Sequence, residues 1–286
     1  MPGQSAEYRR LIVRVYAAVV PCVLGPAVDH FAKGLYYAAR GKREQKIEEF
    51  LDGSVVWGEH VRRVTRTTLL RFNALECPPK GHLILVNHIN ELDFAFDCLV
   101  LRKPYLANAA IKQTFFAYWW MRAMGSEVFD HRSPRSISRS VRGLIAGLEH
   151  RSYVVYPEGS NSYTEEIGAL RKGMLKLAYE HRIPAYVVLK SGMAAFQQQQ
   201  TGNVLGYYAL GTVDPAAFPD WTSFRDRIHE LMAREKPHLD ERVRAAESAQ
   251  KNPASLAGGS GASRSSAAAG SLHTLSADQR HHQRTS

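Results

Sequence analysis

Cysteine is scarce in this chain, which has three in 286 residues. Cys22, Cys77 and Cys98 stand far apart and lack the paired spacing of a zinc site or of a small disulfide-stapled domain. We therefore expect reduced thiols, a reducing compartment and no bound metal. Cys98 falls within an apolar helical pattern, so it is predicted to be a core residue.

Long hydrophobic runs are also missing. A helix that spans a membrane needs about 20 mostly apolar residues. The run at 11–24, LIVRVYAAVVPCVL, is only about two-thirds of that length, and it contains Arg14. No small-residue cleavage site follows this run, so a signal peptide is not predicted.

A second apolar and aromatic stretch, FAKGLYYAA at 31–39, is followed by the basic segment GKREQK. An apolar helical face with basic flanks is typical of a helix that lies in a membrane interface. We predict peripheral or monotopic attachment to a membrane through residues 8–41. The alternative is a set of helices that only cap the domain.

Acidic residues are outnumbered by basic ones, 27 to 37, which gives a net charge of +10. In residues 1–80 there are thirteen basic and eight acidic residues. This excess of positive charge favours a polyanionic partner, such as a phosphorylated substrate, an anionic membrane face or a nucleic acid.

Internal repeats are absent, and a hydrophobic content of 45% suits one sizeable core. Between about residues 80 and 240, short apolar or β-branched runs alternate with helical patterns. This alternation predicts an α/β domain whose sheet is largely parallel or mixed and is flanked by helices. The expected strands are 82–86, 105–109, 127–129, 153–156, 185–189 and 206–212, and the expected helices are 91–102, 112–124, 135–149, 169–181 and 221–235.

Changes in composition divide the chain into three regions. Residues 1–77 form the predicted N-terminal, membrane-associating helical region, and residues 78–240 form the α/β domain. Residues 241–286 form a predicted disordered tail, because small and polar residues dominate from about residue 246 and cannot build a core.

The stretch LILVNHINELDF, residues 83–94, combines an apolar run with polar groups. The run is typical of a buried strand and ends in Asn87-His88, and Asp93 follows five residues after the histidine. In parallel sheets, functional groups gather where strands end at their carboxyl edges. His88 and Glu158 both follow expected strands in this way.

Two interpretations of the histidine and the aspartate are open. In the structural one, Asn90 caps a helix, Asp93 favours the helix dipole from the third helical position, and His88 only closes a strand. In the chemical one, the turn folds the carboxylate back onto one ring nitrogen of His88. The other nitrogen is then a base that can take a proton from a substrate hydroxyl.

No enzyme nucleophile accompanies this pair. The G-x-S-x-G elbow of serine hydrolases is absent, and Ser160 lies in PEGSNS instead. A His–Asp pair without its own serine indicates that the attacking hydroxyl arrives on the substrate. The residues therefore point to acyl transfer to an alcohol.

Four blocks, in order, resemble those of the glycerolipid acyltransferases, the lysophosphatidic acid acyltransferase family of the NHx4D type. NHINELDF is the first block, and it is most similar to the eukaryotic branch that acts on lysophosphatidic acid and lysocardiolipin. Lys112 precedes an aromatic-rich helix, and FDHR at 129–132 is similar to the F-x-x-R block. YPEGSNS at 156–162 resembles F-P-E-G-T-R-S, and IPAYVVL at 183–189 resembles the apolar fourth block. The resemblance covers about residues 78–213.

The resemblance implies transfer of a fatty acyl chain from acyl-CoA to the free hydroxyl of a lysophospholipid, in phospholipid biosynthesis or remodelling. His88 would be the general base and Asp93 its orienting partner, without a covalent acyl-enzyme. Acyl-CoA would be a co-substrate, and no cofactor is implied. The expected location is an intracellular membrane, the endoplasmic reticulum first among them.

The same resemblance implies an acceptor site. Arg132 would hold the phosphate, for which a guanidinium fork is well shaped. Glu158 and Gly159 would shape the pocket, with Gly159 letting backbone N–H groups approach an anion. The remaining predicted substrate-binding residues are Ser160, Asn161, Lys112 and Lys172.

Two residues depart from the family pattern. Asn161 stands where relatives usually have an arginine, which removes one cation from the acceptor site, and Val187 replaces a frequent second proline. Arg132, Arg135, Arg139 and Arg142 recur every three or four residues, and this basic stripe suits either a solvated face or a surface for CoA phosphates.

Three other functions compete with this one. A degenerate family member would bind lipid or shape membranes without turnover, and Asn161 supports that alternative while the intact His–Asp pair opposes it. A thioesterase or lipase would use water as the acceptor, which the missing serine elbow disfavours. Nucleic-acid binding would explain the charge but none of the four blocks, so no nucleic-acid partner is expected.

Overall fold

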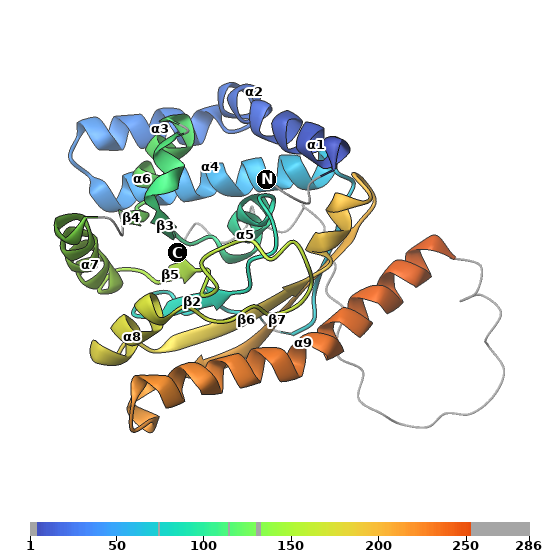
Figure 1. The fold of residues 1–286 in the computed structure, drawn as a ribbon. Helices are drawn as coiled ribbons and strands as arrows, with labels where there is room; N and C mark the ends of the chain where they lie inside the picture. The colour runs from blue at the N-terminus through green and yellow to red at the C-terminus, as the bar shows by residue number, and fades with distance from the viewer. Residues whose placement is uncertain (1–4, 74, 114, 130–132, 253–286) are drawn as a thin grey trace, which may run out of the picture.

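The structure is a computed structural model that describes residues 5–73, 75–113, 115–129 and 133–252 (Figure 1). Its helices are α1 (Ala6–Ala17), α2 (Val19–Leu24), α3 (Val28–Ala39), α4 (Arg43–Val64), α5 (Asp93–Leu101), α6 (Phe115–Ala123), α7 (Pro134–Leu148), α8 (Lys172–Glu180) and α9 (Trp221–Lys251). Its strands are β1 (Thr68–Arg71), β2 (Leu83–Val86), β3 (Leu106–Asn108), β4 (Glu127–Phe129), β5 (Tyr153–Val155), β6 (Ala185–Ser191) and β7 (Val204–Val213).

The strands form a five-stranded sheet in the order β1-β7-β6-β2-β5 and a two-stranded sheet of β3 and β4. Neighbouring strands are parallel except for β6 and β7, which are antiparallel. Strand β2 lies between β6 and β5, so its carboxyl end is flanked by two other strands. The predicted α/β fold with a largely parallel sheet and flanking helices is confirmed.

Helices cover both faces of the sheet, which explains why β2 is apolar at every position. Ile84 and Val86 enter a core with the N-terminal helices and α5. Leu83 and Leu85 point the other way, into a core with side chains of α7, α8 and α9. Figure 1 shows the resulting layers, with α1 to α4 on one side of the sheet and α8 and α9 on the other.

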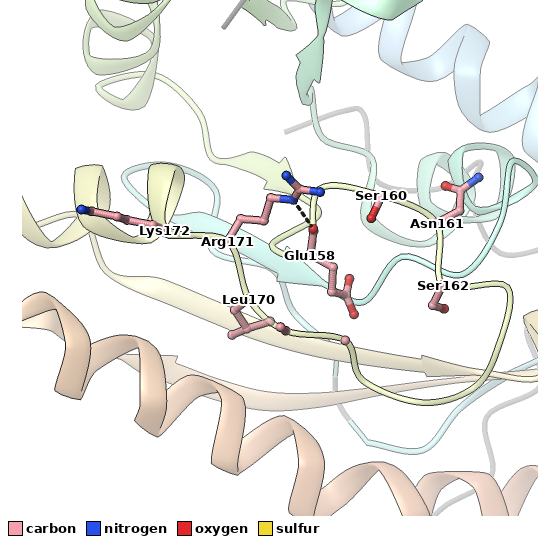
Figure 2. A pocket seen from close by; sticks show the side chains of 9 residues that line it. Glu158, Ser160, Asn161, Ser162, Leu170, Arg171 and Lys172 are labelled. Atoms are coloured by element: carbon pink, nitrogen blue, oxygen red, sulfur yellow. Dashed lines mark hydrogen bonds between the residues drawn. The ribbon is translucent and has the colours of Figure 1, made fainter.

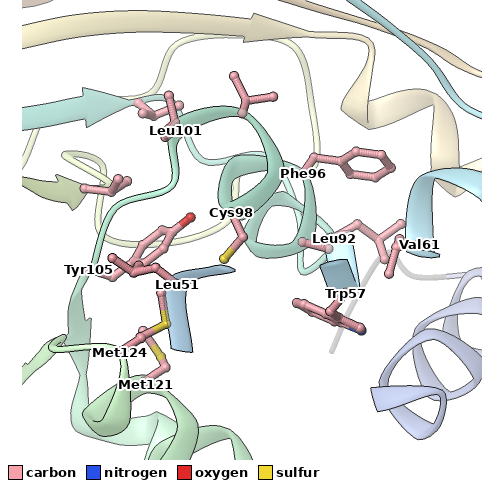
Figure 3. Close-up of a cluster of buried hydrophobic side chains, with 14 of the residues drawn as sticks. Leu51, Trp57, Val61, Leu92, Phe96, Cys98, Leu101, Tyr105, Met121 and Met124 are labelled. Atoms are coloured by element: carbon pink, nitrogen blue, oxygen red, sulfur yellow. The ribbon is translucent and has the colours of Figure 1, made fainter. Parts of the chain in front are cut away.

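Helix α4 holds α5, the helix that begins with Asp93, against the sheet. The two helices approach closely at Gly58, where an added Cβ would lie 2.4 Å from the backbone oxygen of Ala95. Trp57 and Val61 of α4 lie close to Leu92 and Phe96 in this cluster (Figure 3). The cluster includes Cys98, which is buried, so its predicted place in the core is confirmed.

All six expected strands are present, with ends that differ from the prediction by two residues or fewer. Strand β1 was not predicted, because four half-apolar residues among basic ones carry no alternating signal, yet it pairs with β7 at the sheet edge. Helix α4 falls within the predicted N-terminal helical region, residues 1–77, but its bounds were not predicted. Its 22 residues mix charged and apolar side chains, and one face is buried.

Helix α9 extends beyond the predicted 221–235 and ends at Lys251. Leu239 and Val243 are buried in the core under the sheet, so the helix continues as long as it has apolar side chains to bury there. Helical structure thus reaches into the segment assigned to the tail from residue 241. The rest of that segment, residues 253–286, lies outside the described residues.

Candidate active site

Histidine 88 is placed by the carboxyl end of β2. The side chain of Asn87 donates to the backbone oxygen of Lys190 over 3.0 Å and accepts from its backbone nitrogen over 2.8 Å, which ties this end of β2 to β6. His88 follows, with its ring stacked on Tyr156 at a centroid distance of 3.9 Å. Its Nδ1 lies 2.8 Å from Oδ2 of Asp93, so the structure brings together the two residues that the sequence singled out.

The turn between them differs from the expected helix cap. Asp93 is the first residue of α5 rather than its third, and the N-cap is Leu92. Asn90 instead accepts a hydrogen bond from the backbone nitrogen of Leu92 and donates to the backbone oxygen of Met193. The prediction of an Asn90 cap was wrong, because its side chain is used inside the turn and in a contact to the segment after β6.

The carboxylate of Asp93 folds back over this turn. Oδ2 accepts from the backbone nitrogens of Ile89 at 2.6 Å and Asn90 at 3.2 Å, as well as from His88. Because Nδ1 of His88 meets a carboxylate, we assign the ring proton to Nδ1. Nε2 then keeps a free lone pair, which is the arrangement that a general base requires.

Asp93 is completely buried, but it is ionised. Burial by itself raises the pKa of this carboxyl, yet the ammonium group of Lys190 and the hydrogen bond from His88 outweigh burial and leave the pKa below its usual range. A negative charge therefore stands behind His88 at neutral pH. Such a charge stabilises the imidazolium that forms when the ring takes up a proton.

A pocket of about 500 Å³ lies between the loop that follows β5 and the start of α8 (Figure 2). It includes four of the predicted substrate-binding residues, Glu158, Ser160, Asn161 and Lys172, together with Ser162, Gly168, Ala169, Leu170 and Arg171. Glu158 connects the pocket to the base, because its Oε2 accepts a hydrogen bond of 2.7 Å from the backbone nitrogen of His88. Glu158 thus contacts both the pocket and the backbone of the residue that carries the base.

Glu158 is itself an unusual carboxyl group. It is 5% exposed, and its second oxygen, Oε1, has no hydrogen-bond partner among the described residues. Burial raises its pKa to about 7, although the His88 N–H and Lys190 act in the opposite direction. Near neutral pH this group exchanges a proton, so it can either donate a hydrogen bond into the pocket or accept one.

Gly159 makes the turn at the pocket wall, and only glycine fits there. Its φ is +70°, and an added Cβ would lie 2.9 Å from the Cδ atom of Arg171. Its own N–H donates to the backbone oxygen of Tyr156 over 3.1 Å. The expectation that Gly159 opens backbone N–H groups to an anion therefore does not hold for that N–H, and the glycine instead makes room for an arginine.

Arg171 was missed by the sequence analysis. Its Nε donates to the backbone oxygen of Glu158 over 3.0 Å, and Figure 2 shows its guanidinium group beside Glu158 and near Ser160. Lys172 was predicted instead, but its side chain points away from these residues, and its ammonium group lies 5.4 Å from the ring centre of Trp221. The signal in the sequence was the pair Arg-Lys before a helix, and only the second residue of the pair was considered.

The loop that carries Asn161 is bound to the turn that carries His88. The backbone nitrogens of Ser162 and Tyr163 donate to the backbone oxygens of His88 and Ile89 over 3.0 and 2.8 Å. Glu91 then accepts from the hydroxyls of Tyr163 at 2.5 Å and of Tyr8 in α1 at 2.7 Å. This carboxylate, which the sequence analysis did not single out, links the N-terminal helix to the pocket loop.

The remaining predicted residues lie elsewhere. Lys112 is exposed in the 3-10 helix η1 (Ala109–Gln113), and its ammonium group lies 6.0 Å from the ring centre of Tyr118 rather than at the pocket wall. Arg132 lies outside the described residues. Arg135, Arg139 and Arg142 are exposed on α7. In the part of the chain that the structure describes, no cluster of His, Cys, Asp or Glu side chains is arranged to hold a metal ion.

Known proteins resemble this chain in sequence and in fold. Residues 64–189 match the family model described as Acyltransferase. The 1-acyl-sn-glycerol-3-phosphate acyltransferase of Saccharomyces cerevisiae is 30% identical over 137 residues, which cover 43% of this chain and 43% of the yeast protein. The match therefore spans less than half of that relative.

A solved structure shows the same fold. The crystal structure of the 1-acyl-sn-glycerophosphate (LPA) acyltransferase PlsC from Thermotoga maritima superposes with a TM-score of 0.63, covering 80% of this chain and 97% of that one. At 16% sequence identity, this likeness concerns the fold alone. Residues 64–189, which include the His88–Asp93 pair and all of the residues that line the pocket, thus match the Acyltransferase family.

Proposed function

We propose that this protein transfers a fatty acyl chain from acyl-CoA to the free hydroxyl of a lysophospholipid such as lysophosphatidic acid. The observation that carries the proposal is the His88–Asp93 pair, whose Nδ1 and Oδ2 atoms lie 2.8 Å apart and which Glu158 connects to a pocket whose wall contains a guanidinium group. The names of the yeast and bacterial relatives support the same class of acceptor.

The reaction follows from the protonation state of the pair. Nε2 of His88 takes the proton of the acceptor hydroxyl while its oxygen attacks the thioester carbon of acyl-CoA. The new C–O bond forms, the C–S bond breaks, and the departing CoA sulfur takes the proton from the imidazolium. Asp93 stays ionised throughout and stabilises the imidazolium between the two proton transfers.

The pocket would take the phosphate of the acceptor. Arg171 presents a guanidinium group there, and Ser160 and Ser162 bring hydroxyls to the same wall. We keep Arg132 and Lys112 as further proposed phosphate contacts. The exposed arginines of α7 are the proposed surface for the phosphates of CoA.

The test of this function is an assay of the purified protein in detergent or liposomes with labelled oleoyl-CoA and a panel of lysophospholipids. We expect labelled phospholipid to form with at least one phosphorylated acceptor. Release of free oleate alone would indicate a thioesterase. Binding of lysophospholipid without any turnover would indicate the degenerate, lipid-binding alternative.

Asn161 is proposed to set the preference for the headgroup. Its side chain lines the pocket and donates to the hydroxyl of Tyr163 over 3.1 Å, where relatives usually place a cation. A phosphate monoester carries nearly two negative charges at neutral pH, and a diester carries one. The loss of one cation should therefore penalise lysophosphatidic acid more than a diester such as lysophosphatidylinositol.

Replacing Asn161 with arginine is expected to raise the ratio of kcat/KM for lysophosphatidic acid over that for lysophosphatidylinositol by about tenfold. One added charge-assisted hydrogen bond contributes about 1.5–3 kcal/mol. Asn161→Gln is the matched control, because it lengthens the side chain without adding charge. An unchanged ratio in Asn161→Arg would mean that this position does not sense headgroup charge.

The N-terminal helices expose large apolar side chains, which we propose form one apolar face: Val13, Val20, Leu24, Val28, Leu35 and Tyr36. Val13 and Leu24 are 68% and 67% exposed, and Arg9, Arg10 and Arg14 of α1 are exposed near Val13. No single helix among the described residues is long and apolar enough to cross a membrane, and only the pair Ala6–Leu24 and Val28–Ala39, bent by 70°, reaches that length together. We propose that the exposed apolar face lies in a membrane surface, with the endoplasmic reticulum as the proposed location.

Replacing Val13, Val20 and Leu24 together with aspartate is expected to weaken binding to anionic liposomes about 100-fold. Each buried apolar side chain contributes roughly 1–2 kcal/mol, and each new negative charge is repelled. Flotation measures the binding. Ile137→Asp, at an exposed apolar position on α7, is the control. Point variants are preferable to a deletion, because Tyr8, Leu11 and Val15 of α1 are buried in the core.

A further inference from the structure

Lys190 is a completely buried lysine in the middle of the fold. It lies in β6, whose seven residues are all buried, next to the end of β2 that carries His88. A lysine ammonium group in such a place costs free energy unless opposite charges and hydrogen bonds compensate for its lost hydration. Its contacts therefore indicate its role.

The ammonium group of Lys190 touches two carboxylates. Its Nζ lies 3.0 Å from Oδ2 of Asp93 and 2.8 Å from Oδ2 of Asp97, and both aspartates are fully buried. The hydroxyls of Tyr156 and Tyr207 donate to Asp97 over 2.7 Å each. Lys190 thus bonds to the same Asp93 oxygen that receives the hydrogen bond from His88.

The surrounding elements close this network around the His–Asp pair. Tyr156 stacks on the ring of His88, and the ammonium group of Lys190 lies 4.9 Å from the ring centre of Tyr156. Lys190 therefore borders the pair in two ways, through the Asp93 carboxylate and through the aromatic ring on which His88 rests. Lys190, Asp93 and Asp97 are all fully buried, so the arrangement has little freedom to move.

We propose that Lys190 is a positioning residue for the His88–Asp93 pair, whose ammonium group keeps Asp93 ionised and holds its Oδ2 against Nδ1 of His88. This role rests on the proposed acyl transfer, in which His88 is the base. Lys190 acts on His88 through its neighbours, chiefly Asp93.

The charges of the network agree with this role. Asp93 and Asp97 outweigh burial and raise the pKa of Lys190, which stays protonated. Burial and the charge of Asp93 raise the pKa of Asp97, whereas the pKa of Asp93 is lowered. The charge of Lys190 lowers the pKa of both carboxyl groups, and together with the hydrogen bond from His88 it leaves that of Asp93 below its usual range. The titratable groups around Asp93 and Lys190 are His88, Asp97, Tyr156, Glu158 and Tyr207.

The first test is Lys190→Met, which keeps the length of the side chain and removes its charge. We expect kcat for acyl transfer to fall by about 100-fold while KM for both substrates changes by less than about threefold. We also expect the acid limb of the pH profile of kcat/KM to shift to higher pH by about one unit, because Asp93 loses the cation that keeps it ionised. An unmoved acid limb together with a wild-type kcat would overturn the proposal.

Two further variants separate positioning from stability. Lys236 of α9 is also a buried lysine, and it bonds to Glu165 and Asp240. Lys236→Met should lower the free energy of unfolding without shifting the acid limb of the pH profile.

The double variant Lys190→Met/Asp97→Asn removes one charge of each sign, so it should fold even where Lys190→Met does not. The acid limb of its pH profile should still be shifted. Full recovery of kcat and of the profile in the double variant would show that Lys190 only neutralises Asp97.

A second readout does not depend on turnover. Diethylpyrocarbonate modifies unprotonated imidazole, and mass spectrometry of the peptide that contains His88 follows this reaction across pH. We expect the midpoint for His88 to rise by about one unit in Lys190→Met. If the wild-type protein transfers no acyl group, the proposed function fails while this midpoint still tests Lys190. If transfer occurs but neither the midpoint nor the acid limb moves, only the role of Lys190 fails.

Discussion

Replacing His88 with alanine is expected to lower kcat for acyl transfer by about 10²–10⁴-fold, which is the usual loss when a general base is removed. The ring of His88 is bonded to the Asp93 carboxylate, and the His88 backbone nitrogen is bonded to Glu158 in the pocket wall. Initial rates with labelled oleoyl-CoA and lysophosphatidic acid measure the effect. Folding should be nearly unchanged, because Asp93 keeps its bonds to Ile89, Asn90 and Lys190.

His82 supplies a matched control for this variant. It lies just before the opposite end of β2, and its Nδ1 is bonded to the backbone oxygen of Lys80. His82→Ala should therefore retain turnover. Wild-type turnover by a well-folded His88→Ala protein would refute the proposed mechanism. His88 would then have only a structural role at the end of the strand.

The second large effect is expected for Asp93→Asn, which should lower kcat by about 10²–10⁴-fold with little change of shape. Oδ2 of Asp93 takes all the hydrogen bonds, and Oδ1 has no partner among the described residues. An asparagine can therefore keep its oxygen at the Oδ2 position and place its nitrogen at Oδ1, where no donor faces it. The substitution then removes the charge and keeps the geometry of the turn. The loss of kcat therefore measures how much the negative charge stabilises the imidazolium.

The double variant His88→Ala/Asp93→Asn gives the decisive comparison. If the two residues act as one unit, its kcat should be no lower than that of His88→Ala alone, because the contribution of Asp93 requires the ring. Multiplied losses would mean that Asp93 acts separately. If Asp93→Asn lowers only the free energy of unfolding, Asp93 has a structural role in the turn before α5.

The sheet was predictable because its strands are covered on both faces. Strands such as β2 and β6 then read as continuous apolar runs between helical patterns, and their ends were placed within two residues. Strand β1 was missed because a short edge strand leaves a weak local signal and is stabilised by a partner distant in sequence, β7. Helix α4 lies in the region predicted to be helical, and its buried positions 47, 50, 51, 54, 57, 58 and 61 follow a helical period that could have given its bounds.

The sequence by itself determined the pairing of His88 with Asp93, because five residues and one tight turn separate them and local chain geometry brings them together. The loop YPEGSNS was likewise recognisable as part of the same site. The neighbours of this pair were decided by the tertiary structure alone. Lys190 comes from a strand 97 residues after Asp93, and Arg171 reaches the pocket because Gly159 leaves space for it. The sequence around Lys190 contains no partner that would indicate its role. The two carboxylates that bind it come only from the packing of β6 against β2 and α5.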